Sequence, residues 1–139
     1  MAAALLAQIV QQPGIGRPWQ ISSAGTWAIP DLPAMSLSQK VMARKGIDLS
    51  NHRSRCLTAE LLKAADVILA MTQYQVEAIR AEFPEAADKT MLISQLIGEA
   101  FDINDPVTGT EEDYRRCADD LAAILTAGYN RLEDLMRHA

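Results

Sequence analysis

The chain has 139 residues, 49% of them apolar, which is enough for one globular domain with a buried core. Its formal net charge of -5 supplies no basic surface, which argues against nucleic acid or an acidic membrane as a partner. No apolar run approaches the roughly 18 residues that a membrane span needs. Two cysteines, Cys56 and Cys117, are typical of a reduced cytoplasmic protein. We therefore expect a single cytoplasmic domain over residues 1–139.

Helical and strand patterns alternate along the chain, which favours a parallel α/β sheet flanked by helices. The expected elements, in chain order, are a helix over residues 1–12, a strand over Trp19–Ser23, a helix over Ala34–Lys45 that Gly46 ends, a short helix from Thr58 to Lys63, a strand over Val67–Met71, a helix from Thr72 to Phe83, a strand over Met91–Ile93 and a long helix that Thr110 caps. Gly14, Gly16 and Pro18 are expected to form the first connection.

Capping chemistry supports the helices. Thr72 with Gln75 three residues later forms a capping box, and Pro84 ends the helix that follows. The last helix has the clearest periodicity, since its apolar residues recur at intervals of three and four. These are Tyr114, Cys117, Leu121, Ile124, Leu125, Leu132 and Leu135.

Asp105-Pro106 stands in a polar loop just before that last helix. A carboxylic acid fixed before a rigid proline is suited to protonate a leaving group once substrate is bound. Taken alone, the pair is more typical of an ordinary surface turn. Its meaning therefore depends on the rest of the chain.

Three further segments precede that pair: Ser23-Ala24-Gly25-Thr26 after a strand, Gly46–Arg55 after a helix, and Ala65–Thr72 as a buried strand. In this order and spacing the chain resembles the low-molecular-weight protein tyrosine phosphatases. Members of that family begin with a strand, a C-x5-R-S phosphate loop and a proline before a helix similar to Met1–Leu6. The resemblance implies a four-stranded parallel sheet flanked by helices, here truncated, with the first central strand missing.

The resemblance also implies roles for individual residues. Asp105 matches the general acid of the family, and Ser23 and His52 match residues that brace the phosphate loop. Trp27 lies close to a family cleft aromatic, although a core position is equally compatible with its apolar neighbours. His52 is equally compatible with an exposed loop histidine that has no role in bracing the loop. Ser23 is equally compatible with a strand-end hydroxyl bonded to its own backbone. Val107 stands where the family usually has an aromatic wall of the substrate cleft.

No residue of the chain is expected to act as the nucleophile. Position 62, six residues after Cys56, is Leu, and position 123, six after Cys117, is Ala, so neither cysteine begins a C-x5-R loop. Cys117 lies on the apolar helix face, where a structural thiol is expected. Packing is also favoured for Cys56, although nearby Arg53 and Arg55 are able to lower a thiol pKa. The scattered cysteines and histidines predict neither a metal site nor any other cofactor.

The resemblance thus implies a phosphatase for phosphotyrosine or phosphoarginine in proteins, acting through a cysteinyl-phosphate and inactive without its loop. Alternatives are a catalytically dead module that binds or oligomerises and, less favoured, a thiol-coupled arsenate reductase. The expected partner is a phosphorylated protein, not a nucleic acid or a membrane. A missing central strand predicts direct pairing of Trp19–Ser23 with Val67–Met71, or a homodimer through the unpaired strands. Asp105 is expected at a cleft rim near the start of the first helix.

Overall fold

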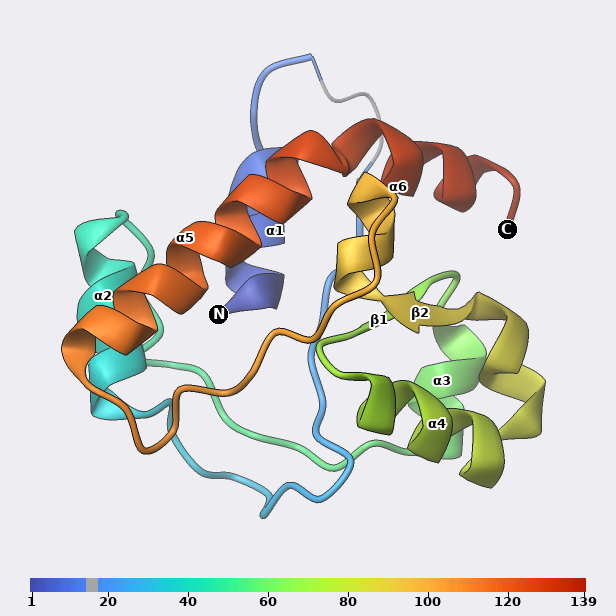
Figure 1. Cartoon of the computed structure of the whole chain (residues 1–139), viewed down its shortest axis with the longest axis horizontal. Helices are drawn as coiled ribbons and strands as arrows, with labels where there is room; N and C mark the ends of the chain where they lie inside the picture. Colours follow the sequence, from blue (N-terminus) through green and yellow to red (C-terminus); the bar gives the residue numbers. More distant parts are fainter. Residues whose placement is uncertain (15–17) are drawn as a thin grey trace.

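The computed structural model describes residues 1–14 and 18–139 (Figure 1). Its elements are α1 (Ala2–Val10), α2 (Ser36–Arg44), α3 (Ala59–Ala64), β1 (Ile68–Ala70), α4 (Gln73–Glu82), the 3-10 helix η1 (Pro84–Lys89), β2 (Thr90–Leu92), the 3-10 helix η2 (Ile93–Ile97), α5 (Glu111–Ala127) and α6 (Tyr129–Arg137). The part of the expected first connection that contains Gly16 lies outside the described residues.

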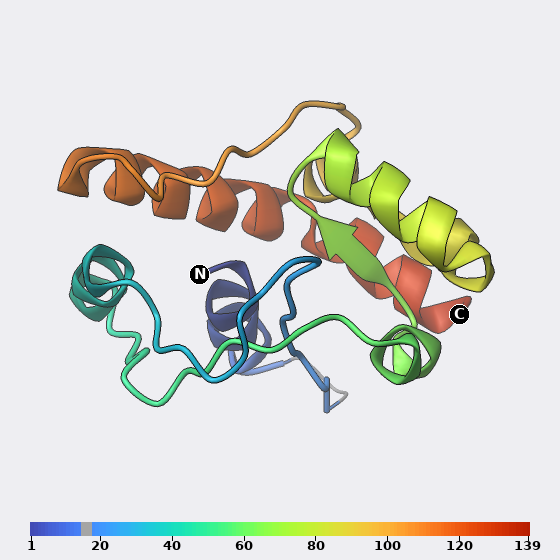
Figure 2. The ribbon, with the colours of Figure 1, turned by 90° about the horizontal axis from the view of Figure 1, so that it is seen from below.

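A short parallel sheet forms the centre of the α/β half of the molecule. Strands β1 and β2 pair in the register Ile68–Thr90, Leu69–Met91 and Ala70–Leu92. Helix α4 connects them, as a parallel crossover requires, and lies beside β1 in the view from below (Figure 2). The strands are short because each is followed at once by a helical turn or cap.

The main core lies between α5 and the helices α1 and α2, over which α5 passes (Figures 1 and 2). The periodic face of α5 supplies its centre, where Tyr114 is 2% exposed and Ala118 is 0% exposed. Leu5 and Leu6 come from α1, and Met42 comes from α2. Burying such side chains at about 25 cal/mol per Å² of apolar surface accounts for the attachment of α1.

The predicted helix caps are confirmed. The hydroxyls of Thr58, Thr72 and Thr110 each accept a hydrogen bond from the backbone N–H three residues later. Gln75 completes the capping box with Thr72. Gly46 follows α2 with a φ of 76°, a left-handed conformation that favours glycine.

The strand expected over Trp19–Ser23 is wrong, and so is its direct pairing with Val67–Met71. A strand forms only where its N–H and C=O groups meet a neighbouring strand, and β1 pairs with β2 instead. The indole of Trp19 stacks on the Tyr129 ring, with centroids 5.7 Å apart, so packing on α6 positions this segment. The extended contact that does form nearby is a single parallel bridge between Gly25 and Cys56.

The last helix is also interrupted, which its periodicity does not predict. Gly128 separates α5 from α6, where a Cβ would lie 2.5 Å from Leu96 Cβ. The break lets α6 turn along η2, and Leu132 remains buried. Within the described part of the chain, each helix is too short or too polar to cross a bilayer.

Candidate functional site

The loop from Phe101 to Thr110 carries Asp105 and is fixed at its start to the sheet end of the molecule. The hydroxyl of Ser94 bonds both backbone groups of Phe101. The next residue, Asp102, accepts the backbone N–H of Gln73 at 2.8 Å. The N–H of Ile103 donates to the Met71 carbonyl oxygen, also at 2.8 Å. Asp105 follows two residues later and is exposed.

The far end of the loop is fixed to α5. The backbone N–H of Gly109 donates to the Pro106 carbonyl oxygen at 2.6 Å, which closes a tight turn after Asp105. Asp113 accepts the N–H of Thr110 at 2.8 Å, and the Thr110 hydroxyl in turn accepts the Asp113 N–H. The hydrogen bond from the Thr110 backbone holds the pKa of Asp113 below its ordinary value. Residues 104–108 thus form a short span between two anchored ends.

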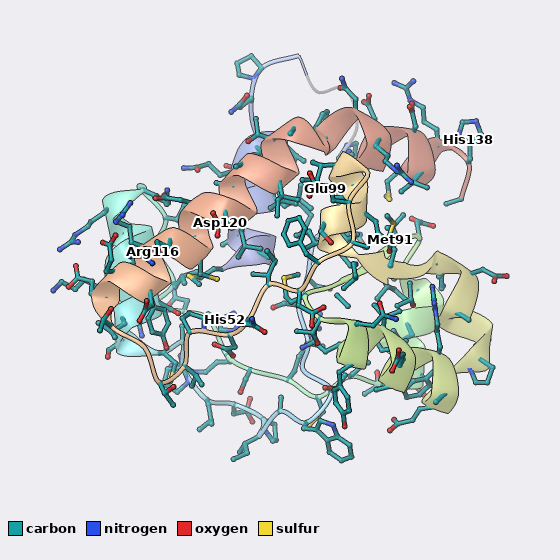
Figure 3. The ribbon with its side chains drawn as sticks, in the orientation of Figure 1. His52, Met91, Glu99, Arg116, Asp120 and His138 are labelled. Carbon is teal, nitrogen blue, oxygen red and sulfur yellow. The ribbon has the colours of Figure 1, made fainter. Side chains whose placement is uncertain are left out.

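A cavity of about 400 Å³ opens between this loop and α5. Its lining side chains come from these two segments: Phe101, Asp102, Ile103, Asn104, Asp105, Pro106, Asp113, Arg116, Cys117 and Asp120. Arg116 and Asp120 project from α5 (Figure 3). Four carboxylates and one guanidinium therefore line the cavity, and this negative balance favours a ligand with cationic character over an additional anion. Among the described residues no three His, Cys, Asp or Glu side chains are arranged to hold a metal ion.

The amino group of Met1, which precedes α1, lies within electrostatic range of Asp105 and Cys117. Burial lowers the pKa of the Met1 amino group, while the negative charges of Cys117 and Asp105 act to raise it. Burial is also the main cause that raises the pKa of the Cys117 thiol, followed by the charge of Asp105. Asp105, Cys117 and the first residue of the chain thus form one electrostatic group. A thiol with a raised pKa is a poor nucleophile at neutral pH, in agreement with a structural role for Cys117.

Ser23 belongs to a second group of segments. The guanidinium Nε of Arg55 donates to the Ser23 carbonyl oxygen at 2.9 Å, and the Gly25 N–H donates to the Arg55 carbonyl at 3.0 Å. The Cys56 thiol donates to the Ala28 carbonyl oxygen at 2.7 Å. Cys56 is exposed, so the packing expected for it is wrong; backbone pairing with Gly25 holds it at the surface instead. These contacts bring the Ser23 segment against the residues that follow His52.

The remaining residues expected at the site are exposed. Trp27 is 74% exposed, which excludes its alternative as a core anchor, and Val107 is 51% exposed. Ser23 and His52 are exposed as well. Neither the Trp27 segment nor these two residues line the cavity beside Asp105. The expected supporting residues therefore do not contribute to the wall of that cavity.

Sequence reasoning missed Ser94, Asp102 and Arg116. Ser94 and Asp102 give no local signal, because their partners Phe101 and Gln73 are identified only by the fold. Arg116 occupies the same helix as the predicted apolar face, yet it lies toward the cavity. The sequence contains no signal for this position, because only the structure shows that the neighbouring Cys117 borders both core and cavity.

Comparison with known proteins identifies one family for this chain. The family model for low molecular weight phosphotyrosine protein phosphatase matches residues 1–136. The chain belongs to that family. The protein-arginine-phosphatase of Geobacillus stearothermophilus is 38% identical over 126 residues, which cover 90% of this chain and 81% of that relative. A probable low-molecular-weight protein-tyrosine-phosphatase, EpsP of Ralstonia solanacearum, is 39% identical over 76% of this chain and 68% of its own length.

A solved structure of the same kind confirms the fold. The YwlE arginine phosphatase of Geobacillus stearothermophilus superposes with a TM-score of 0.85 at 34% identity, over 99% of this chain and 87% of that one. The resemblance inferred from the sequence is therefore confirmed for family and for fold class. This chain has the α/β fold of a low-molecular-weight phosphatase.

Proposed function

We propose that this domain, when a C-x5-R-S-P phosphate loop precedes it, removes phosphate from phosphorylated proteins, with Asp105 as the general acid. In this mechanism a cysteine thiolate attacks phosphorus and forms a sulfur–phosphorus bond, while the bond from phosphorus to the leaving atom breaks. Asp105 donates its proton to that leaving atom and then takes a proton from the water that hydrolyses the cysteinyl-phosphate. The single observation that carries the proposal is the exposed, doubly anchored position of Asp105 near the start of α1 in a chain of this family.

We further propose phosphoarginine as the preferred substrate over phosphotyrosine. Val107 provides no aromatic face beside Asp105-Pro106, so a flat tyrosyl ring gains little there. The acidic cavity at Asp105 suits a leaving group that is a guanidine. The arginine phosphatases among its relatives point in the same direction.

The 139 residues contain no Cys followed by Arg six positions later, so this chain alone is proposed to be inactive. The nucleophile and the loop that holds the phosphoryl oxygens supply most of the rate acceleration in such a reaction. The same observation supports a second candidate, a pseudophosphatase that binds a partner without turnover. Reading the coding DNA upstream of Met1 in frame discriminates between the two. A strand followed by C-x5-R-S-P favours the enzyme, and a closed frame favours the binding module.

The decisive experiment compares the 139-residue chain with a loop-bearing protein. We define the latter as this chain preceded by a strand and a C-x5-R-S-P loop, taken from the upstream frame or grafted from the Geobacillus relative. We expect no burst and no turnover from the 139-residue chain on an aryl phosphate, and turnover from the loop-bearing protein. Phosphate release from a phosphoarginine protein should exceed release from its phosphotyrosine counterpart. Activity of the 139-residue chain contradicts the mechanism.

The acid role has its own test in the loop-bearing protein. Asp105→Asn should slow poor leaving groups by about a hundredfold, and good leaving groups much less, because only the former need a proton. Asp88→Asn, an exposed aspartate in η1, is the matched control and should leave both rates unchanged. Equal slowing of both classes by Asp105→Asn contradicts the assignment.

A further inference from the structure

Ser94, the second residue of η2, links the core to the loop that carries Asp105. Ser94 is fully buried, with an exposed fraction of 0%. The hydroxyl donates to the Phe101 carbonyl oxygen at 2.8 Å and accepts the Phe101 N–H at 3.0 Å. One hydroxyl therefore binds both backbone groups of a single residue. Such an arrangement fixes the position and the rotation of that peptide segment.

The chain between these two residues is a closed turn. Gly98 adopts a φ of 79° and reverses the chain direction after η2. The Glu99 N–H donates to the Ser94 carbonyl oxygen at 3.3 Å, so the same serine also holds the middle of the turn. Phe101 thus leaves the turn at a point that Ser94 defines.

The next two residues continue the anchored path. The Asp102 carboxylate accepts the backbone N–H of Gln73, the first residue of α4. The backbone N–H of Ile103 donates to the carbonyl oxygen of Met71, which directly follows β1. The three consecutive residues 101–103 are therefore hydrogen-bonded to η2, to α4 and to the end of β1, respectively. Asp105 follows the last anchor by two residues, so a change at Phe101 is transmitted to it through a short chain.

We propose that Ser94 is a positioning residue for the general acid. Its hydroxyl sets the path of Phe101 and thereby the direction from which the Asp105 carboxyl reaches the leaving group. Ser94 does not touch substrate and acts through the backbone of residues 101–105. The inference rests on the proposed role of Asp105.

In the loop-bearing protein, Ser94→Ala should lower kcat for a poor leaving group about tenfold, with a much smaller effect on a good one. In an Asp105→Asn background the same substitution should have no further effect, because the group that it positions is absent. Thr90→Val is the matched control. Thr90 is 2% exposed and its hydroxyl donates to the Ala86 carbonyl oxygen at 2.7 Å, away from the acid loop.

A second measurement uses the 139-residue chain and does not depend on activity. Amide hydrogen exchange at Phe101 and Ile103 should rise about tenfold in Ser94→Ala, and amides inside α5 should keep their rates. Thr90→Val should leave the Phe101 and Ile103 amides unchanged. Unchanged exchange at both amides in Ser94→Ala overturns the inference.

The kinetic outcomes separate the inference from the proposed function. If Asp105→Asn changes the leaving-group dependence and Ser94→Ala slows good and poor leaving groups equally, Ser94 is merely structural and the inference is overturned. If Asp105→Asn leaves that dependence unchanged, the acid role itself fails and the inference fails with it. Loss of rate confined to poor leaving groups in both variants supports both proposals.

Discussion

The backbone N–H of Ile103 donates to the carbonyl oxygen of Met71 at 2.8 Å. Met71 directly follows β1, so the loop that carries Asp105 is attached at the carboxyl end of a parallel strand. Open α/β sheets place their ligand sites at this end. The hydrogen bond therefore connects the carboxyl end of β1 to the loop where the family chemistry is proposed.

Gly109→Ala should displace the loop after Asp105. An added Cβ would lie 2.7 Å from Asp113 Oδ2, closer than real Cβ contacts, and 3.0 Å from the Pro106 carbonyl oxygen, which is tighter than most. Either the capping carboxylate or the turn must move. We expect a loss of about 1–3 kcal/mol in the free energy of unfolding, measured by urea denaturation.

Thr108→Ala, at the exposed neighbouring position, is the control and should change stability by less than about 0.5 kcal/mol. If Gly109→Ala is as stable as this control, the tight approach between the turn and Asp113 is not part of the folded state.

Gly128→Ala should destabilise the junction of α5 and α6. Its Cβ would lie 2.5 Å from Leu96 Cβ and 3.0 Å from the Ile124 carbonyl oxygen, with no flexible side-chain end to yield. Overpacking of this kind costs about 1–3 kcal/mol. The expected readout is a lower Tm in a thermal melt, against an unchanged Tm for Thr126→Ala on the exposed side of α5. Equal melting temperatures would show that α6 is free to move away from η2.

Local chemistry made much of the fold predictable. The caps at Thr58, Thr72 and Thr110 use contacts within three residues, so the sequence contains both partners. The apolar run likewise identifies the strand Ile68–Ala70 at the correct place, although Ala70 is buried and its other two residues are only half-buried. The break at Gly128 was not predictable, because it depends on Leu96, a residue distant in the sequence.

The features that the sequence did not predict depend on contacts between residues that are distant in the chain. Trp19–Ser23 has the composition of a strand, but Trp19 stacks on Tyr129 and no sheet neighbour is available in the described chain. In the candidate site, Asp105-Pro106 was recognisable as a local pair. Ser94 was not, because its partner Phe101 lies across a turn whose closure depends on tertiary packing.

Ion pairs between α2 and α5 predict acid sensitivity. Lys40 donates to the Glu111 carboxylate at 2.9 Å, and Arg44 pairs with the same group. The hydrogen bond from Lys40 is the main cause that lowers the pKa of Glu111 from its ordinary 4.5. Because the folded pKa lies below the unfolded one, this stabilisation is complete above pH 4.5 and is lost as the pH falls through the lowered pKa.

Urea midpoints measured from about pH 6 to pH 3 should therefore fall, and Glu111→Gln should flatten part of that decrease. Added salt should reduce the difference between the two proteins, because the pair is exposed. Glu85→Gln, at an exposed position of η1, is the control. A Glu111→Gln protein with the same pH slope as this control would exclude the α2–α5 pairs as a source of stability.

The rate at which the Cys117 thiol reacts should depend on the negative charge of nearby Asp105. In a Cys56→Ser background Cys117 is the only thiol, and burial raises its pKa, with the Asp105 charge as the next cause. Asp105→Asn removes that charge and lowers the thiol pKa. Since the thiolate is the nucleophile, reaction with an aromatic disulfide at about pH 8 should become roughly two- to threefold faster. Asp120→Asn, whose charge contributes less, should give a smaller increase, and Asp88→Asn should give none. A rate that does not rise in Asp105→Asn would place the acid away from Cys117 and from the start of α1.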